Sequence, residues 1–234
     1  GELVHAGVCA SVAAGAVRCE GDSAAVVTPS VFRGVYAGPS QTAGPIITRH
    51  GAYEFVPCAG DSPEDLYLGI HDRMTQLETA IAADDDTDVL VFDGPLRGRN
   101  DPRGVGFVKT QHVRYLPDDQ QRVLARLAAG QRTPIFLIGG RGFTRWSWYL
   151  RLPGPVSQPL SGIVRCELPG AGTVAAAVSR ANVVTAMLPR YASEAHKDSR
   201  APQNLYPIAG LENELRRRLG DQRILERALR LAAT

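Results

Sequence analysis

A helical pattern leads directly into a short apolar run near the middle of the chain. Ser62 can cap a helix that begins at Pro63, and two acidic residues follow. The apolar residues then recur at helical spacing as Leu66, Ile70, Met74, Leu77 and Ile81. This pattern predicts a helix over residues 63–83. The run of residues 89–92 is continuously apolar, which predicts a strand buried on both faces, with Asp93 at its carboxyl end.

The flanking segments predict more strands and helices, so the fold class is α/β. Before residue 60, β-branched and aromatic clusters separated by Gly, Pro and Ser predict strands at 24–28, 31–36, 46–48 and 53–56. After Asp93 the patterns predict a loop at 97–106, a helix at 117–130, a buried strand at 134–138 and half-buried strands at 146–152 and 162–168. Helices are predicted at 174–188, at 208–219 and from Asp221, the N-cap, onward.

Composition excludes several classes of protein. The chain has 234 residues, 44% hydrophobic and 21% charged, which is typical of one globular domain. No apolar run approaches the roughly 18 residues needed to cross a bilayer, so no membrane role is expected. Four cysteines without metal-binding spacing predict free thiols in a reducing cytoplasm. Residue 1 is Gly, and residues 2–9 resemble the inside of a strand, so we expect further residues upstream.

Arginine provides nearly all of the positive charge. The 26 basic residues include only two lysines, Lys109 and Lys197, while the formal net charge is +2. No phosphate-binding loop of the type G-x-x-x-x-G-K-[ST] and no G-x-S-x-G nucleophile motif occurs. The chain is therefore not expected to hydrolyse nucleotides itself, and any ATPase would be a partner.

Two carboxylates are candidates for chemistry. Asp93 ends a strand, where open α/β sheets leave a crevice for ligands. Glu78 lies at the border of the apolar stripe of the preceding helix and could face the sheet. Two carboxylates directed at one point favour a divalent cation such as Mg²⁺ or Mn²⁺. The competing interpretations are an ordinary Asp-Gly turn for Asp93 and a solvated helix residue for Glu78.

The order of elements resembles the ribonuclease H-like fold, a mixed sheet flanked by helices. Nucleases of that fold join an Asp on the first strand, a Glu on the first helix and an Asp ending the fourth strand. Several segments in sequence order also resemble the NurA nuclease family. They are Leu77-Glu78, residues 91–96, 106–109, 148–152 and 164–167, and Asn204-Leu205-Tyr206-Pro207.

The resemblance implies a single NurA-like nuclease domain over residues 1–234, with additional C-terminal strands and helices and with its first strand upstream of residue 1. It implies a nuclease that uses Mn²⁺ or Mg²⁺ in DNA end processing, forms a homodimer and works with a hexameric HerA-type ATPase. Carried over by position, it makes Glu78 and Asp93 metal ligands and catalytic residues. It also makes Lys109 a catalytic residue that meets a phosphate, against the alternative of a solvated strand-edge lysine.

The chain departs from the family pattern at two positions. The first-strand Asp-Gly motif is absent, and the His that follows Tyr-Pro in the family is replaced by Leu211-Glu212-Asn213-Glu214. Glu212 or Glu214 could substitute as an oxygen ligand, or each could be a helix-surface acid that pairs with the arginines at 216–218.

Three arginines are predicted DNA contacts. Arg97 and Arg99 follow Asp93 in a loop, where guanidinium groups can bind phosphates, and Arg151 lies on the polar face of a predicted strand. The first functional hypothesis is thus a metal-dependent DNA nuclease of the NurA type. The alternative is a catalytically inactive ribonuclease H-like subunit that binds nucleic acid or an ATPase ring, and a structural protein without nucleic-acid contact is the third interpretation.

Overall fold

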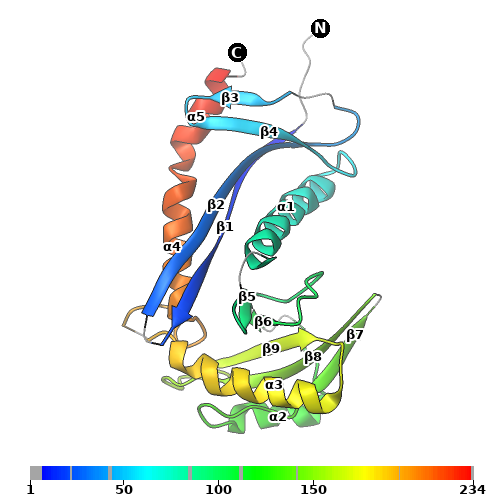
Figure 1. Cartoon of the computed structure of the whole chain (residues 1–234), viewed down its shortest axis with the longest axis vertical. Coiled ribbons are helices and arrows are strands. Elements are labelled where there is room, and N and C mark those ends of the chain that lie inside the picture. The colour runs from blue at the N-terminus through cyan, green and yellow to red at the C-terminus, as the bar shows by residue number, and fades with distance from the viewer. Residues whose placement is uncertain are drawn as a thin grey trace. The chain divides into compact units, whose positions relative to one another are not determined.

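The computed structural model describes residues 7–21, 23–41, 44–83, 86–110, 113–140, 142–194 and 196–232. The chain forms two compact units, one from residues 1–85 with 210–234 and the other from residues 86–209. Each unit contains a mixed sheet flanked by helices, so the fold class is α/β as predicted (Figure 1). The single nuclease domain expected over the whole chain stays a prediction.

The first unit is built on a four-stranded sheet in the order β1-β2-β4-β3. Its strands are β1 (Val8–Glu20), β2 (Ser23–Ala37), β3 (Ile46–Thr48) and β4 (Gly51–Pro57). β1 and β2 form a long antiparallel hairpin, and β4 runs parallel to β2. Its helices are α1 (Pro63–Ala83), α4 (Tyr206–Leu219), whose residues from Gly210 onward belong to this unit, and α5 (Gln222–Ala232).

Local chemistry explains how α1 begins and how α4 approaches the sheet. The Ser62 hydroxyl accepts a hydrogen bond from the backbone N–H of Asp65 at 3.1 Å, which caps the helix, and donates one to the Asp65 carboxylate at 2.7 Å. On β1, a Cβ added at Gly15 would lie 3.1 Å from Leu211 and 3.3 Å from Leu215 of α4. Glycine at this position therefore lets α4 pack directly on the strand.

The second unit is built on a five-stranded sheet in the order β5-β6-β9-β8-β7. Its strands are β5 (Leu90–Asp93), β6 (Gly104–Val108), β7 (Phe136–Gly140), β8 (Phe143–Arg151) and β9 (Ile163–Pro169). Only the β5–β6 pair is parallel, and the other neighbours in this sheet are antiparallel. Its helical elements are α2 (Asp118–Arg126), α3 (Val174–Met187) and the 3₁₀ turn η1 (Leu188–Tyr191).

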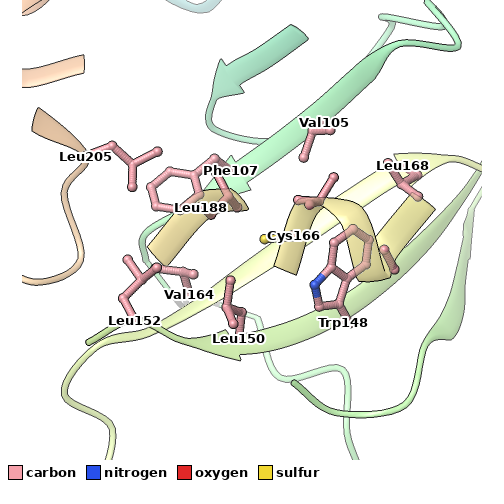
Figure 2. Packing of buried hydrophobic residues seen from close by; sticks show 12 residues of the cluster. Val105, Phe107, Trp148, Leu150, Leu152, Val164, Cys166, Leu168, Leu188 and Leu205 are labelled. Atoms are coloured by element: carbon pink, nitrogen blue, oxygen red, sulfur yellow. The ribbon is translucent and has the colours of Figure 1, made fainter. Parts of the chain in front are cut away.

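The main core of the second unit lies between this sheet and α3. Trp148 and Leu150 from β8 pack with Phe107 from β6 and Cys166 from β9, and all four are fully buried (Figure 2). Burial raises the pKa of the Cys166 thiol well above its ordinary value, so this cysteine is chemically inert. All four cysteines of the chain are free thiols, as predicted.

The sequence patterns predicted most elements but not which strands of the second unit are the most buried. The helix over residues 63–83 and the strand ending at Asp93 are confirmed. The strands expected to be buried on both faces, β5 and β7, are instead the two edges of their sheet. The fully buried strand is β6, whose first three residues, 104–106, were predicted to belong to a loop because Gly104 and Gly106 interrupt the apolar residues. β1 is far longer than the expected strand at residues 2–9, and residues 2–6 of that expectation lie outside the described chain.

Within the described residues, no helix combines the length and the apolarity that crossing a membrane requires.

We predict that Leu150→Ala destabilises the second unit by about 2–5 kcal/mol, because it leaves a cavity in a fully buried cluster. Leu137→Ala on β7 is the matched control, since that side chain is 52% exposed. Urea unfolding followed by circular dichroism measures both. Equal losses of stability in the two variants would contradict this location of the core.

Candidate functional site

The ends of two neighbouring parallel strands bring Asp93 and Lys109 together. Asp93 is the last residue of β5 and pairs in register with Phe107 of β6, and Lys109 follows two residues later. The Lys109 Nζ donates a hydrogen bond to Asp93 Oδ2 at 2.8 Å. The Lys109 side chain is 19% exposed and that of Asp93 39%, so both groups can be reached from solvent.

Asn204 fixes this ion pair from within the unit. The residue is fully buried, and its Oδ1 accepts a hydrogen bond from Lys109 Nζ at 3.2 Å. Its Nδ2 donates to Asp198 Oδ2 at 2.6 Å. The amide therefore has one orientation, with oxygen toward the ammonium and nitrogen toward the carboxylate.

Asp198 anchors the other end of this network. Its Oδ1 accepts a hydrogen bond from the backbone N–H of Arg200 at 2.8 Å. That bond, followed by the Asn204 amide and then the nearby positive charges, lowers the pKa of the Asp198 carboxyl below its ordinary value. The network thus runs from Asp93 through Lys109 and Asn204 to Asp198.

A buried carboxylate holds the loop that follows Asp93. Glu167 of β9 accepts a hydrogen bond from the backbone N–H of Leu96 through Oε1, and its Oε2 pairs with Arg165 at 2.6 Å. At Gly106 of β6, an added Cβ would lie 2.6 Å from the Glu167 Cγ. Glycine is therefore required where the Glu167 side chain crosses β6 to reach the loop.

A second buried side chain fixes the continuation of that loop. The Arg145 guanidinium donates to the backbone oxygens of Arg97 and Arg99 and to the side-chain oxygen of Asn100. Arg97 has a φ of 48°, a left-handed conformation uncommon for residues other than glycine. The contacts from Arg145 support this backbone and leave the Arg97 side chain exposed.

The predicted DNA-binding arginines have three different environments. Arg97 is exposed beside Asp93, whereas the Arg99 guanidinium lies 5.0 Å from the Phe92 ring centre and is half-buried. Arg151 is 3% exposed, and its guanidinium donates to backbone carbonyls of Leu124, Pro159 and Ser161. These surroundings favour a structural role for Arg151 over the predicted DNA contact.

Glu78 and Asp93 belong to different units. Glu78 lies half-buried on α1 of the first unit, and Asp93 ends β5 of the second. No group of three or more His, Cys, Asp or Glu side chains arranged to hold a metal is found among the described residues. The joint metal-ligand role of Glu78 and Asp93 stays a prediction.

Of the two acids considered near the C-terminus, Glu214 pairs with arginines of its own helix. Glu214 pairs with Arg217 at 2.5 Å and with Arg218 at 2.8 Å. The hydrogen bond from Arg218, then that from Arg217, lowers the pKa of the Glu214 carboxyl. Glu214 is thus a helix-surface acid engaged by arginines.

Sequence reasoning missed Asn204, Asp198 and Glu167 as parts of the site. Residues 196–200 form a polar stretch and Asn204 opens the segment Asn-Leu-Tyr-Pro, so both segments stand out in the sequence. The sequence does not show which side chains they contact. Glu167 carried a clearer signal, because it is a lone acid within the apolar alternation of a predicted strand.

Comparison of the sequence with protein-family models and with curated proteins finds no match.

We predict that Asn204→Leu raises the pKa of Asp198 toward its ordinary value of 3.8, because the variant removes a hydrogen bond to the carboxylate. A lowered pKa in the fold adds stability above the ordinary pKa, and this contribution disappears as pH falls through the folded value. The variant should therefore lose stability mainly near neutral pH. The difference in unfolding free energy between the variant and the wild type should become smaller in acid.

NMR titration of the Asp198 carboxyl carbon and urea unfolding between pH 2 and pH 7 measure these effects, with the range set by the carboxyl titration. Gln203→Leu is the control, since the Gln203 amide makes only a 3.4 Å contact with the Ile163 carbonyl. An unchanged pKa of Asp198 in Asn204→Leu would contradict the network.

Proposed function

We propose that this protein is a metal-dependent DNA nuclease of the NurA type with a ribonuclease H-like fold, acting in DNA end processing. The observation that carries the proposal is the Asp93–Lys109 pair at the ends of two parallel strands, backed by buried Asn204. Two of the three residues predicted to be catalytic therefore lie within hydrogen-bond distance of each other. The NurA resemblance of the surrounding segments supplies the type of reaction.

Lys109 is positioned to neutralise phosphate charge. Its ammonium is held by two oxygens, Asp93 Oδ2 and Asn204 Oδ1, and is still partly exposed. A preoriented cation lowers the cost of the charge that develops on a phosphodiester during cleavage. The exposed Arg97 on the rigid loop beside Asp93 is suited to bind a neighbouring phosphate.

A divalent cation, Mn²⁺ or Mg²⁺, is part of the proposal through the family resemblance. Such an ion, when bound, supplies Lewis-acid stabilisation of the phosphate and an activated water. The described residues of the second unit do not assemble three ligating side chains around Asp93. The roles above are therefore limited to Lys109, Asn204 and Arg97, and metal dependence is left to the cleavage assay.

The second candidate function is a catalytically inactive subunit that binds nucleic acid or an ATPase ring through the same exposed cations. The two functions differ in whether purified protein cleaves DNA when metal is added.

We include in the proposal a homodimer and a HerA-type hexameric ATPase as partners. Cleavage that depends on ATP only when such an ATPase is present would support this coupling.

We predict that Asp93→Asn abolishes Mn²⁺-dependent DNA cleavage and that Lys109→Ala lowers it by about 10²–10³-fold, because each change removes a preoriented charge. The stability of Asp93→Asn should change by only about 0–1 kcal/mol, since the ion pair is partly exposed. Lys109→Ala also leaves the buried Asn204 Oδ1 without its donor and should cost about 1–3 kcal/mol. The assay follows a labelled DNA substrate with Mn²⁺, with Mg²⁺ and with EDTA.

Lys197→Ala is the matched control for these variants. Lys197 is the chain's other lysine, and it is 63% exposed and pairs with Glu194 at 3.2 Å. Its cleavage rate should equal that of the wild type. Wild-type protein without activity under every metal condition would favour the inactive subunit, and full activity of Asp93→Asn would refute the assigned site.

We predict that the protein is a dimer at micromolar concentration. Size-exclusion chromatography with light scattering should give about twice the chain mass of 25.1 kDa. A mass near 25.1 kDa over the accessible concentration range would refute the homodimer.

A further inference from the structure

Three arginines form one face of α5. Arg223, Arg227 and Arg230 are separated by four and three residues, so they lie on the same side of the helix. All three are exposed. With a rise of 1.5 Å per residue, they extend along about 10 Å of the helix axis.

The opposite face of α5 fixes the direction of these arginines. Ala228 is buried and Leu225 and Leu229 are half-buried, and α5 packs against β3 within the first unit. A free helix of this composition would be a candidate for binding a membrane surface through its apolar side. In α5 much of that side is already covered by the protein itself, and only Ile224 and Leu231 remain exposed beside the arginines.

The nearby acids are hydrogen-bonded to groups other than these arginines. Glu226, on the same helix, accepts a hydrogen bond from Gln222 at 2.8 Å, and Asp221 accepts one from the backbone N–H of Ile224 at 3.1 Å. In the part of the chain that the structure describes, no ion pair joins Arg223, Arg227 or Arg230 to a carboxylate. Arg227 lies at helical spacing from both Arg223 and Arg230, where like charges repel each other, and a bound anion relieves this repulsion.

The preceding helix provides an internal comparison. Arg216, Arg217 and Arg218 of α4 are also exposed, but Arg217 and Arg218 share the carboxylate of Glu214. Two of the three positive charges of α4 are therefore engaged. α5 has three arginines and one glutamate, so its formal charge of +2 equals that of the whole chain.

We propose that the Arg223–Arg227–Arg230 face of α5 binds the phosphate backbone of nucleic acid. Along one strand of a duplex, phosphates follow each other at about 3.4 Å of axial rise, so a face about 10 Å long meets several of them. Guanidinium groups suit phosphate oxygens because they donate two parallel hydrogen bonds. Contacts of this kind are independent of base sequence. The inference adds a second contact for the substrate of the proposed function and is tested without catalysis.

The test is a fluorescence-anisotropy titration of the full chain with a labelled DNA duplex in EDTA, repeated at several salt concentrations and with two unrelated sequences. The variant replaces Arg223, Arg227 and Arg230 with glutamine, which keeps a similar helix propensity. Each lost phosphate contact reduces the slope of log K against log salt by about 0.9, so the slope should become shallower by about 2.7. The loss should be the same for both sequences.

The matched control replaces Arg216, Arg217 and Arg218 with glutamine, which removes the same formal charge. Its slope should change by less than about 1, because Glu214 already engages two of these groups. Circular dichroism verifies that both variants fold.

Three outcomes would overturn the proposal. The first is an unchanged slope in the α5 variant, and the second is an equal change in the α4 control, which would indicate a general charge effect. The third is loss of binding to phosphatidylserine vesicles with no loss of duplex binding, which would assign the face to a lipid surface. Because no cleavage is measured, a failure here is separate from a failure of the nuclease proposal.

Discussion

The buried carboxylate of Glu167 is the interaction on which the geometry of the second unit depends most. It connects β9 to the loop after β5 across the intervening strand β6, where Gly106 leaves the necessary space. Replacing a buried ion pair with apolar residues is often neutral for stability, whereas removing one partner costs about 3–5 kcal/mol. The Arg165–Glu167 pair is therefore better explained by positioning than by stability. What it positions is the backbone at Leu96, three residues after Asp93.

The candidate site is likewise positioned by buried polar groups. The Lys109 ammonium is held by hydrogen bonds inside the unit and is partly exposed to solvent. A lysine side chain has four rotatable bonds, so it loses conformational entropy when it is fixed. At Lys109 that cost is offset by two acceptors, and buried Asn204 is itself oriented by Asp198. The ammonium is thus held in place by the protein's own side chains. Such preorientation distinguishes this lysine from Lys197, which is exposed and pairs with a residue three positions away.

The sequence predicted those features that are encoded locally. α1 was predicted with its exact bounds because the Ser62 cap and a periodic apolar stripe act within the helix itself. The position of Asp93 at a strand end was also predicted from its neighbours. The first residues of β6 were predicted as loop because glycines interrupt its apolar pattern, and Gly106 makes room for the Glu167 side chain, which lies about 60 residues away in sequence. Asn204 was missed as a partner of Lys109 for the same reason, since 95 residues separate them.

Arginine shows most clearly why composition alone does not identify a binding surface. Three arginines are buried, namely Arg145, Arg151 and Arg165. Each donates hydrogen bonds to carbonyl, hydroxyl or carboxylate oxygens of the protein. A guanidinium has five N–H groups, so it can connect several backbone segments at once where no other side chain could. Part of the large arginine content therefore stabilises loops. The arginines that remain available to an external anion are those that are exposed and not engaged by an acid, and Arg97 and the α5 face meet both conditions. These two surfaces follow from burial and pairing, neither of which the sequence pattern displays.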